Sequence, residues 1–154
     1  MSPLVIHTEI IVHAPIDVVW HCLVDVDRYP IWNPFIVGVH RNGASTDIGT
    51  MMRFTLRWPF GFSGRSIEEV TQINPPNRNI QDLQTALWQY DYRGLPYRLG
   101  LLRVSRIQTV TQHSLQQTLY SSTLRFEGIG RHWVPKNQIR KGCTAQAQGL
   151  AAQF

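Results

Sequence analysis

The chain opens with an alternation of apolar and polar residues that is typical of a half-buried strand over residues 4–13. Apolar or β-branched residues occupy one face of this strand: Ile6, Thr8, Ile10 and Val12. Ala14-Pro15 ends it, and proline suits the first turn of a helix. Helical spacing follows over residues 15–24, where the expected inner face holds Ile16, Val19, Trp20 and Leu23. A second short helix is expected around 27–33.

From residue 35 onward the pattern changes to a series of strands. Alternation is clearest over residues 49–58, where one face carries Met52, Phe54, Leu56 and Trp58. Turn residues separate the segments, for example Asn42-Gly43 and the run Asn-Pro-Pro-Asn at 74–77. We therefore predict six further strands, over 35–41, 49–58, 64–73, 78–92, 98–113 and 115–127.

Helical spacing returns near the C-terminus, from about Pro135 or Lys136. Apolar residues recur there three or four positions apart: Ile139, Cys143, Ala147, Leu150 and Phe154. The element order predicts an α+β protein, with a strand, two short helices, six antiparallel strands and a long terminal helix. The 154 residues, 43% of them hydrophobic, suit a single domain over residues 1–154.

An antiparallel sheet that curls around one helix leaves a space between the two. The expected inner faces carry large side chains, whereas the helix offers small ones such as Gly142 and Ala147. Close helix–sheet packing and a ligand cavity are both compatible with this pattern. Trp and Tyr combine a large apolar area with one polar group, so they suit either an aromatic core or a site for an aromatic or isoprenoid ligand. The candidate cavity-lining residues are Trp32, Phe35, Met52, Phe54, Trp58, Trp88, Tyr90, Tyr120, Trp133, Cys143 and Ala147.

Two segments of the N-terminal third resemble the START-like superfamily. They are Ala-Pro-Ile-Asp-Val-Val-Trp at 14–20 and Trp-Asn-Pro-Phe-Ile at 32–36, with weaker similarity over 70–76 and 126–128. This superfamily includes polyketide cyclases, lipid-transfer START domains and the birch-pollen allergen. The resemblance implies a helix-grip fold, in which a curved seven-stranded antiparallel sheet wraps around the C-terminal helix and encloses a cavity. Residues 84–102 are longer and more aromatic than the family's usual hairpin, so their strand register and their role at the cavity mouth stay open.

Charge is distributed unevenly along the chain. Residues 1–92 carry six basic and nine acidic side chains, whereas residues 93–154 carry nine basic ones and a single acid, Glu127, for a balance of +8. Such a basic half is compatible with solvated outer faces, or with an acidic partner such as an anionic membrane surface or an acidic carrier protein. Nucleic acid is not expected as a partner, because no binding motif is visible.

No motif for a cofactor or a metal is present. Six histidines occur without metal-ligand spacing, and P-loop and dinucleotide fingerprints are missing, so we expect neither metal nor cofactor. Cys22 and Cys143 are too few for a disulfide framework. The N-terminus lacks the pattern of a secretory signal, so the expectation is a cytoplasmic protein with reduced thiols.

Acid–base chemistry inside an apolar cavity requires few residues, and one inward titratable group is enough. The strand acids considered for this role are Glu69, Asp82 and Asp91, and the strand bases are Arg53, Arg106 and Arg125. Alternation places Arg53 and Arg125 on the faces opposite Phe54 and Phe126, which argues against both. Each of the six is also compatible with a solvated outer face.

The leading hypothesis is that the chain binds, and possibly transports, a hydrophobic small molecule such as a lipid, a quinone or a polycyclic compound. The alternative is an enzyme, a polyketide cyclase or dehydratase. A third option is an interaction module of the Hsp90-activator type, which shares the fold. A carrier and an enzyme both remain open at this point, as do a monomer and a homodimer.

Overall fold

The computed structural model describes residues 2–58, 63–77 and 84–154. Its strands are β1 (Leu4–Val12), β2 (Ile36–Arg41), β3 (Met51–Arg57), β4 (Ser63–Asn74), β5 (Thr85–Tyr92), β6 (Arg103–Ser114) and β7 (Gln117–Glu127). Its α-helices are α1 (Ile16–Val24), α2 (Tyr29–Trp32), α3 (Leu95–Arg98) and α4 (Lys136–Ala151), and its 3₁₀ turns are η1 (Val26–Arg28) and η3 (Ile129–Trp133). The seven strands form one antiparallel sheet in the order β1-β7-β6-β5-β4-β3-β2. The predicted helix-grip fold is therefore confirmed.

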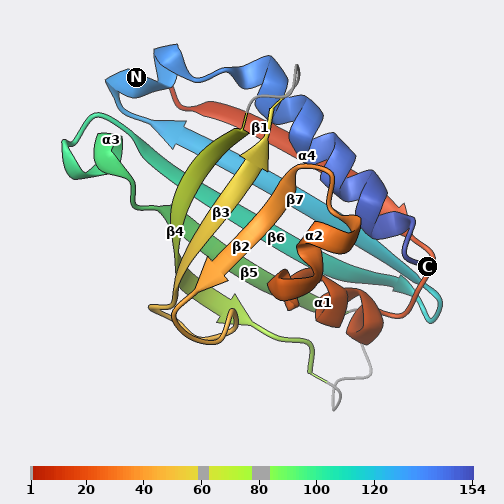
Figure 1. Cartoon of the computed structure of the whole chain (residues 1–154). Helices are drawn as coiled ribbons and strands as arrows, with labels where there is room; N and C mark the ends of the chain where they lie inside the picture. Colours follow the sequence, from red (N-terminus) through yellow and green to blue (C-terminus); the bar gives the residue numbers. More distant parts are fainter. Residues whose placement is uncertain (1, 59–62, 78–83) are drawn as a thin grey trace.

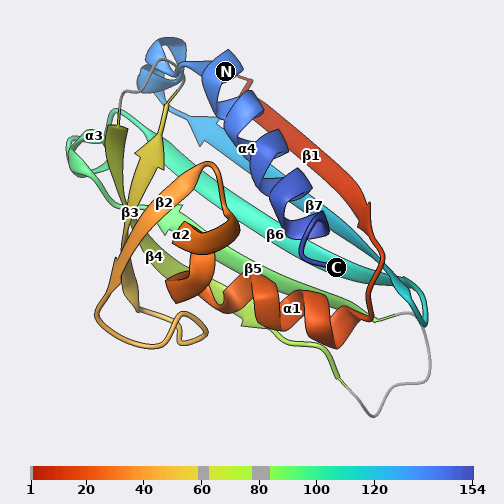
Figure 2. The same cartoon turned by 45° about the vertical axis from the view of Figure 1, so that its right-hand side comes forward.

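The sheet curves around its helices, as Figures 1 and 2 show. The long helix α4 packs along β1, the short helix α2 contacts β2 at the other edge, and α1 lies against β6 and β7 between them. Shifts of register interrupt the pairing of β2 with β3, of β4 with β5 and of β6 with β7. Such irregularities bend strands and increase their twist, which helps the sheet to curl.

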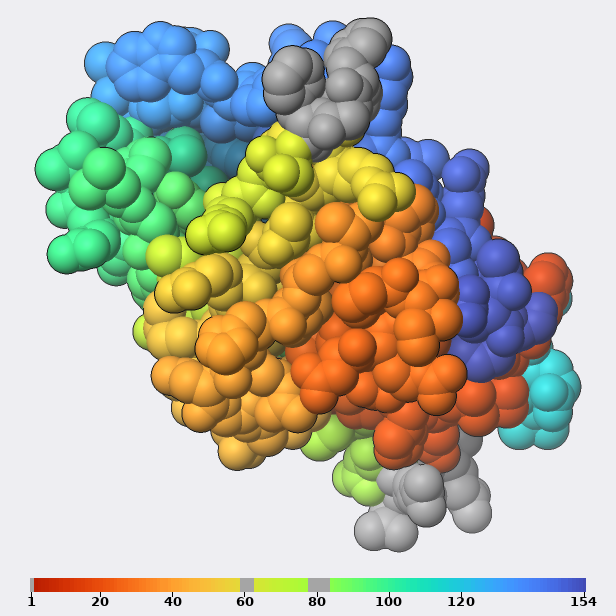
Figure 3. Space-filling view, viewed as in Figure 1, coloured from red at the N-terminus to blue at the C-terminus, as the bar shows by residue number. Residues whose placement is uncertain are grey.

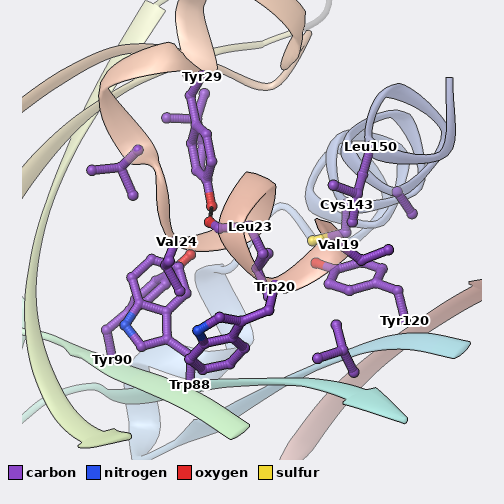
Figure 4. Packing of buried hydrophobic residues seen from close by; sticks show 14 of the residues in the cluster. Val19, Trp20, Leu23, Val24, Tyr29, Trp88, Tyr90, Tyr120, Cys143 and Leu150 are labelled. Atoms are coloured by element: carbon purple, nitrogen blue, oxygen red, sulfur yellow. Dashed lines mark hydrogen bonds between the residues drawn. The ribbon is translucent and has the colours of Figure 1, made fainter. Parts of the chain in front are cut away.

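The first helix fills one half of the space inside the sheet. Its apolar face is buried as predicted, through Ile16, Val19, Trp20 and Leu23. Figure 4 shows this face packed among side chains that come from the sheet, from α2 and from α4. Two polar atoms within this core have backbone partners: the Tyr29 hydroxyl donates to the Leu23 carbonyl, and Trp88 Nε1 donates to the Ser45 carbonyl at 2.9 Å.

Two boundary predictions were wrong. The strand expected over 98–113 begins only at Arg103, because Pro96 sets the first turn of α3 and Gly100, with φ of +72°, ends the turn that follows. The apolar stripe of the terminal helix ends at Leu150, since Phe154 lies beyond the helix and is exposed. The first part of the strand expected over 78–92 lies outside the described residues, and β5 begins at Thr85.

Candidate functional site

A cavity of about 290 Å³ lies between the sheet and the start of α4. Its wall is mostly apolar and aromatic, and comes from β2 to β7 and from the segment that enters α4. The apolar and aromatic lining residues are Phe35, Ile36, Phe54, Leu56, Trp58, Tyr90, Tyr92, Leu102, Val104, Leu124, Phe126, Val134, Pro135 and Ile139. The polar ones are Arg65, Ser66, Glu68 and Arg106. The volume is close to the lower end of the range of roughly 300–1,000 Å³ for small-molecule sites.

Arg106 is the main polar feature of the wall. It lies on β6 opposite Tyr90 of β5, and only 4% of it is exposed. Its Nε donates to Ser122 Oγ at 3.0 Å and its Nη1 donates to the Tyr90 hydroxyl at 3.1 Å. Among the described residues, its Nη2 has no hydrogen-bond partner and its guanidinium forms no ion pair. A guanidinium stays protonated in proteins, so the cavity wall holds a buried positive charge with an unused donor.

Glu68 is the carboxyl group of the cavity. It lies on β4 and is half-buried, and Ser66, two residues earlier on the same face, donates a hydrogen bond to its Oε1. Burial raises the pKa of Glu68 to about 7, although the Ser66 hydrogen bond and the positive charge of Arg106 act in the opposite direction. Desolvation outweighs both because it penalises the ionised form directly. Glu68 can therefore hold or release a proton near neutral pH.

Burial also raises the pKa of Tyr90, with the charge of Arg106 acting against it. This tyrosine consequently keeps its proton at neutral pH, and its hydroxyl oxygen accepts the bond from Arg106. The phenol, the guanidinium and the carboxyl group come from three neighbouring strands, β5, β6 and β4. The arrangement can hold an oxygen atom of a ligand and exchange a proton with it.

The structure brings four of the eleven predicted lining residues to the cavity: Phe35, Phe54, Trp58 and Tyr90. Six others pack in the core or at its border instead, namely Trp32, Met52, Trp88, Tyr120, Cys143 and Ala147. Trp133, which is 71% exposed, lies on the surface. Their part in ligand binding stays a prediction.

There is a physical reason why some of the predicted residues line the cavity while others pack in the core. Alternation along the strands identifies the face of the sheet that points inward, but it does not tell which half of the interior α1 fills. Figure 4 shows Val19 of α1 near Tyr120 and Cys143. None of these three residues, and no residue of α1, lines the cavity. The open space therefore remains at the end where α4 begins.

Two small residues of α4 serve close packing. A Cβ atom at Gly142 would lie 2.4 Å from Cδ1 of Phe35, and one at Gly149 would lie 2.8 Å from the carbonyl oxygen of Trp32. The interpretation as close packing therefore holds for these two glycines, and neither lines the cavity. The middle and end of α4 pack closely, whereas Ile139 in its first turn lines the cavity.

Of the five candidate acids and bases that the structure describes, Arg106 alone lines the cavity. Glu69 and Asp91 lie near the Arg93 guanidinium, at 3.7 and 3.8 Å, and Asp82 lies outside the described residues. Arg53 is exposed, and Arg125 is exposed and pairs with Glu127. Glu68 was not predicted from the sequence, although alternation with the buried Val70 on the same strand could have identified it.

The cysteines show no sign of nucleophilic chemistry. Burial raises the pKa of Cys143, and burial together with the charge of Asp25 raises the pKa of Cys22 to about 11. Both therefore stay protonated thiols at neutral pH. Over residues 2–58, 63–77 and 84–154, no group of three or more His, Cys, Asp or Glu side chains could hold a metal ion. In the same residues, no helix has the length and apolar character needed to cross a membrane.

Comparison with known proteins matches residues 3–152 to the model of a family described as polyketide cyclase / dehydrase and lipid transport. A curated relative is the oxopyrrolidines biosynthesis cluster protein O of Penicillium oxalicum, which is 28% identical over 111 residues. The match covers 63% of this chain and 54% of that protein, so it spans about half of the relative's length.

Solved structures with a similar fold cover nearly the whole chain. An aromatase/cyclase from Streptomyces sp. R1128 has a TM-score of 0.74 at 13% identity, covering 99% of this chain and 93% of that one. Norcoclaurine synthase from Thalictrum flavum, in complex with dopamine and hydroxybenzaldehyde, has a TM-score of 0.69 at 16% identity. The match covers 99% of this chain and 86% of that one. Major latex-like protein 151 from Panax ginseng has a TM-score of 0.73 at 11% identity, and the match covers 99% of this chain and 98% of that one. At these identities the similarity shows the fold alone.

Proposed function

The chain belongs to the polyketide cyclase / dehydrase and lipid-transport family, and from that premise we propose that it binds a small, largely apolar molecule in the cavity beside α4. The ligand would carry at least one oxygen atom, such as a carbonyl, phenolate or carboxylate oxygen. The observation that carries the proposal is the unpartnered Nη2 of Arg106 on the wall of this cavity.

The apolar wall accounts for most of the expected affinity. Aromatic and aliphatic side chains surround the space, and burial of apolar ligand surface against them contributes roughly 25 cal/mol per Å². Phe54 packs edge-on against Tyr90, and Phe35 packs edge-on against Trp58. These contacts fix the orientation of four rings in the cavity wall, and the fixed rings constrain the shape of a ligand. A flat or polycyclic ligand suits such a wall better than a bulky branched one.

The buried guanidinium supplies specificity. A buried charged donor without a partner costs more than the roughly 1–3 kcal/mol of a neutral one, and a ligand oxygen that accepts from Nη2 recovers that cost. Discrimination against a hydrocarbon of the same shape follows, because such a ligand would leave the charge unsatisfied. Ser122 and Tyr90 fix the plane of the guanidinium, so the donor direction is set before the ligand arrives.

Fluorescence titration tests this proposal with two ligands, the apolar fluorophore N-phenylnaphthylamine as probe and a naphthol as oxygen-bearing competitor. Leu102→Trp places a larger side chain in the cavity and should abolish probe uptake. Arg106→Met should keep probe uptake but weaken naphthol competition about tenfold or more, as expected for loss of a charge-assisted hydrogen bond. Leu115→Trp, at an exposed position of the β6–β7 turn, is the matched control and should change neither. Probe uptake that is equal in wild type and Leu102→Trp would refute the site.

A second candidate function, catalysis of a cyclisation or dehydration, is favoured by one specific observation. Glu68 borders the same cavity as Arg106, and the pKa of Glu68 is raised to about 7. A general base works best when its pKa lies near the working pH. A carrier has no need of such a group, whereas an enzyme acting on a carbonyl compound requires one.

The proton balance of such a step is simple. The Glu68 carboxylate takes a proton from a carbon beside a ligand carbonyl, and the C–H electron pair becomes the C=C bond of an enolate whose oxygen Arg106 stabilises. The enolate carbon attacks a second carbonyl of the same chain to form a C–C bond, and the proton on Glu68 passes to the new alkoxide.

Turnover of a synthetic oligoketide thioester tests this candidate. Glu68→Gln should remove catalysis while probe uptake stays intact, and Glu69→Gln, on the other face of the same strand, should leave both unchanged. Cyclisation at the spontaneous rate with wild type would leave binding as the sole function.

A further inference from the structure

Five large apolar side chains are exposed at one end of the molecule. Four are aliphatic and one is an indole: Leu95 at 63%, Leu99 at 62%, Leu101 at 38%, Ile129 at 51% and Trp133 at 71% exposure. They come from two segments of the chain, α3 with the turn that follows it and the 3₁₀ turn η3. We call these five residues the apolar patch.

Backbone contacts hold the two segments together. The Gly130 N–H donates to the Leu101 carbonyl at 2.8 Å, and Gly128, with φ of +93°, brings its Cα so close that a Cβ would lie 2.5 Å from the same oxygen. No other residue fits at position 128 without strain. Figure 3 shows the two segments side by side at one corner of the molecule, with the surface hollowed between them and β4.

The apolar patch borders the cavity. Leu102 follows Leu101 in the chain, and Val134 and Pro135 follow Trp133, and all three of these neighbours line the cavity. Pro135 and Arg65 are exposed lining residues, so the cavity reaches the surface at this end. An apolar ligand that leaves here therefore meets apolar side chains before it meets water.

Basic side chains lie close in the chain to the two segments of the apolar patch. Arg98 and Arg103 stand next to the first segment in the sequence, Lys136 and Arg140 follow the second, and all four are exposed. The single acid of residues 93–154, Glu127, forms an ion pair with Arg125 at 2.8 Å. The surface therefore combines apolar side chains with an excess of positive charge.

We propose that the apolar patch and its basic flank dock the protein on an anionic lipid bilayer, with the cavity mouth turned toward the lipid. The charge complementarity selects the partner. Basic side chains near an anionic bilayer each contribute to binding, while Leu and Trp side chains enter the boundary between headgroups and acyl chains. The side chains stand out from two helical turns, which suits insertion into a deformable lipid surface.

Vesicle flotation tests the proposal with phosphatidylcholine vesicles, with and without phosphatidylglycerol. Wild type should float with the anionic vesicles and not with the neutral ones. Leu99→Glu and Trp133→Glu should each lower the partition coefficient about tenfold or more, since each removes an inserted side chain and adds a repelled charge. Leu115→Glu is the matched control, because Leu115 is equally apolar and 79% exposed in the β6–β7 turn.

Two charge-reversal variants measure the electrostatic contribution to vesicle binding separately from the apolar one. Arg98→Glu should weaken binding roughly thirtyfold, from two charge changes near the surface, and Arg53→Glu, exposed on β3, should weaken it less than threefold. Binding to anionic vesicles that is absent, or that falls equally in Leu99→Glu and Leu115→Glu, would overturn the proposal. Uptake of N-phenylnaphthylamine without vesicles should be equal in wild type, Leu99→Glu, Leu115→Glu, Arg98→Glu and Arg53→Glu, so a failure of docking is distinguished from a failure of the proposed ligand binding.

Discussion

Replacing Glu68 by glutamine tests whether the cavity holds a carboxyl group that resists ionisation. Glutamine keeps the shape of the side chain and can still accept the hydrogen bond from Ser66, but it removes the charge. The pKa of Glu68 is raised from its ordinary value of 4.5 to about 7, chiefly by burial. The substitution therefore removes the desolvation penalty that the carboxylate suffers in the folded protein.

The magnitude follows from this pKa difference. A tenfold change in proton affinity is worth roughly 1.4 kcal/mol, so the difference corresponds to about 3 kcal/mol at most. Glu68 is only half-buried and borders a cavity that water can enter, so screening reduces the effect. We expect a free energy of unfolding that is about 1–3 kcal/mol higher for Glu68→Gln than for wild type once Glu68 is ionised.

The pH dependence has a definite sign. The folded state binds the Glu68 proton more tightly than the unfolded state, so the contribution of Glu68 to stability falls as the pH rises from 4.5 to about 7. Below this window both states are protonated and the two proteins should be about equally stable. Above this window the difference in free energy of unfolding between Glu68→Gln and wild type should be constant.

Urea denaturation across this pH range is the assay, with Glu69→Gln as the matched control. Glu69 lies on the same strand but on the outer face, 3.7 Å from Arg93. Its replacement should cost at most about 1 kcal/mol and should bring no gain at high pH. A Glu68→Gln variant that is no more stable than wild type above pH 7, or a gap that does not change with pH, would refute the assignment of Glu68 to a desolvated site.

Three further outcomes are expected from the packing. Gly142→Ala should lower the free energy of unfolding by about 1–3 kcal/mol in a urea titration and weaken probe uptake, because the new methyl group displaces the Phe35 ring that lines the cavity; unchanged uptake would contradict this coupling. Tyr29→Phe should cost about 1–3 kcal/mol by the same assay, since the Leu23 carbonyl loses its buried partner; a neutral effect would show that water replaces the hydroxyl. The Cys143 thiol should react with Ellman's reagent only when denaturant unfolds the chain, because burial raises its pKa and blocks access; rapid labelling of the native protein at this position would contradict its burial.

Much of the fold could be predicted from the sequence because the local signals agree. Alternation identified the inward faces of β1 and β3, and the spacing of the apolar residues in α1 identified its buried face. These signals depend on neighbours in the chain, and the resemblance at residues 14–36 supplied the arrangement of the elements. The same signals could not locate α3, because Pro96 and Gly100 act through backbone geometry rather than through a hydrophobic pattern.

The cavity was harder to predict because it depends on which elements compete for the interior. Tyr90 and Tyr120 both point inward, yet Tyr120 packs near α1 and α4 while Tyr90 reaches the open end. Glu68 and Glu69 are adjacent in the chain, and a single position decides which one faces the cavity. The apolar patch combines segments that lie about thirty residues apart, so only the folded structure brings it together.

The central claim is that the cavity beside α4 holds a small oxygen-bearing ligand. Native mass spectrometry of the wild-type protein and of Leu102→Trp, both purified from the natural source, tests this most directly. We expect one additional mass per wild-type chain, released by organic solvent and identified as a mainly apolar compound with at least one oxygen atom, and we expect it to be missing from Leu102→Trp. A wild-type chain that is folded but carries no ligand and takes up no probe, or an equal added mass in both proteins, would contradict the account.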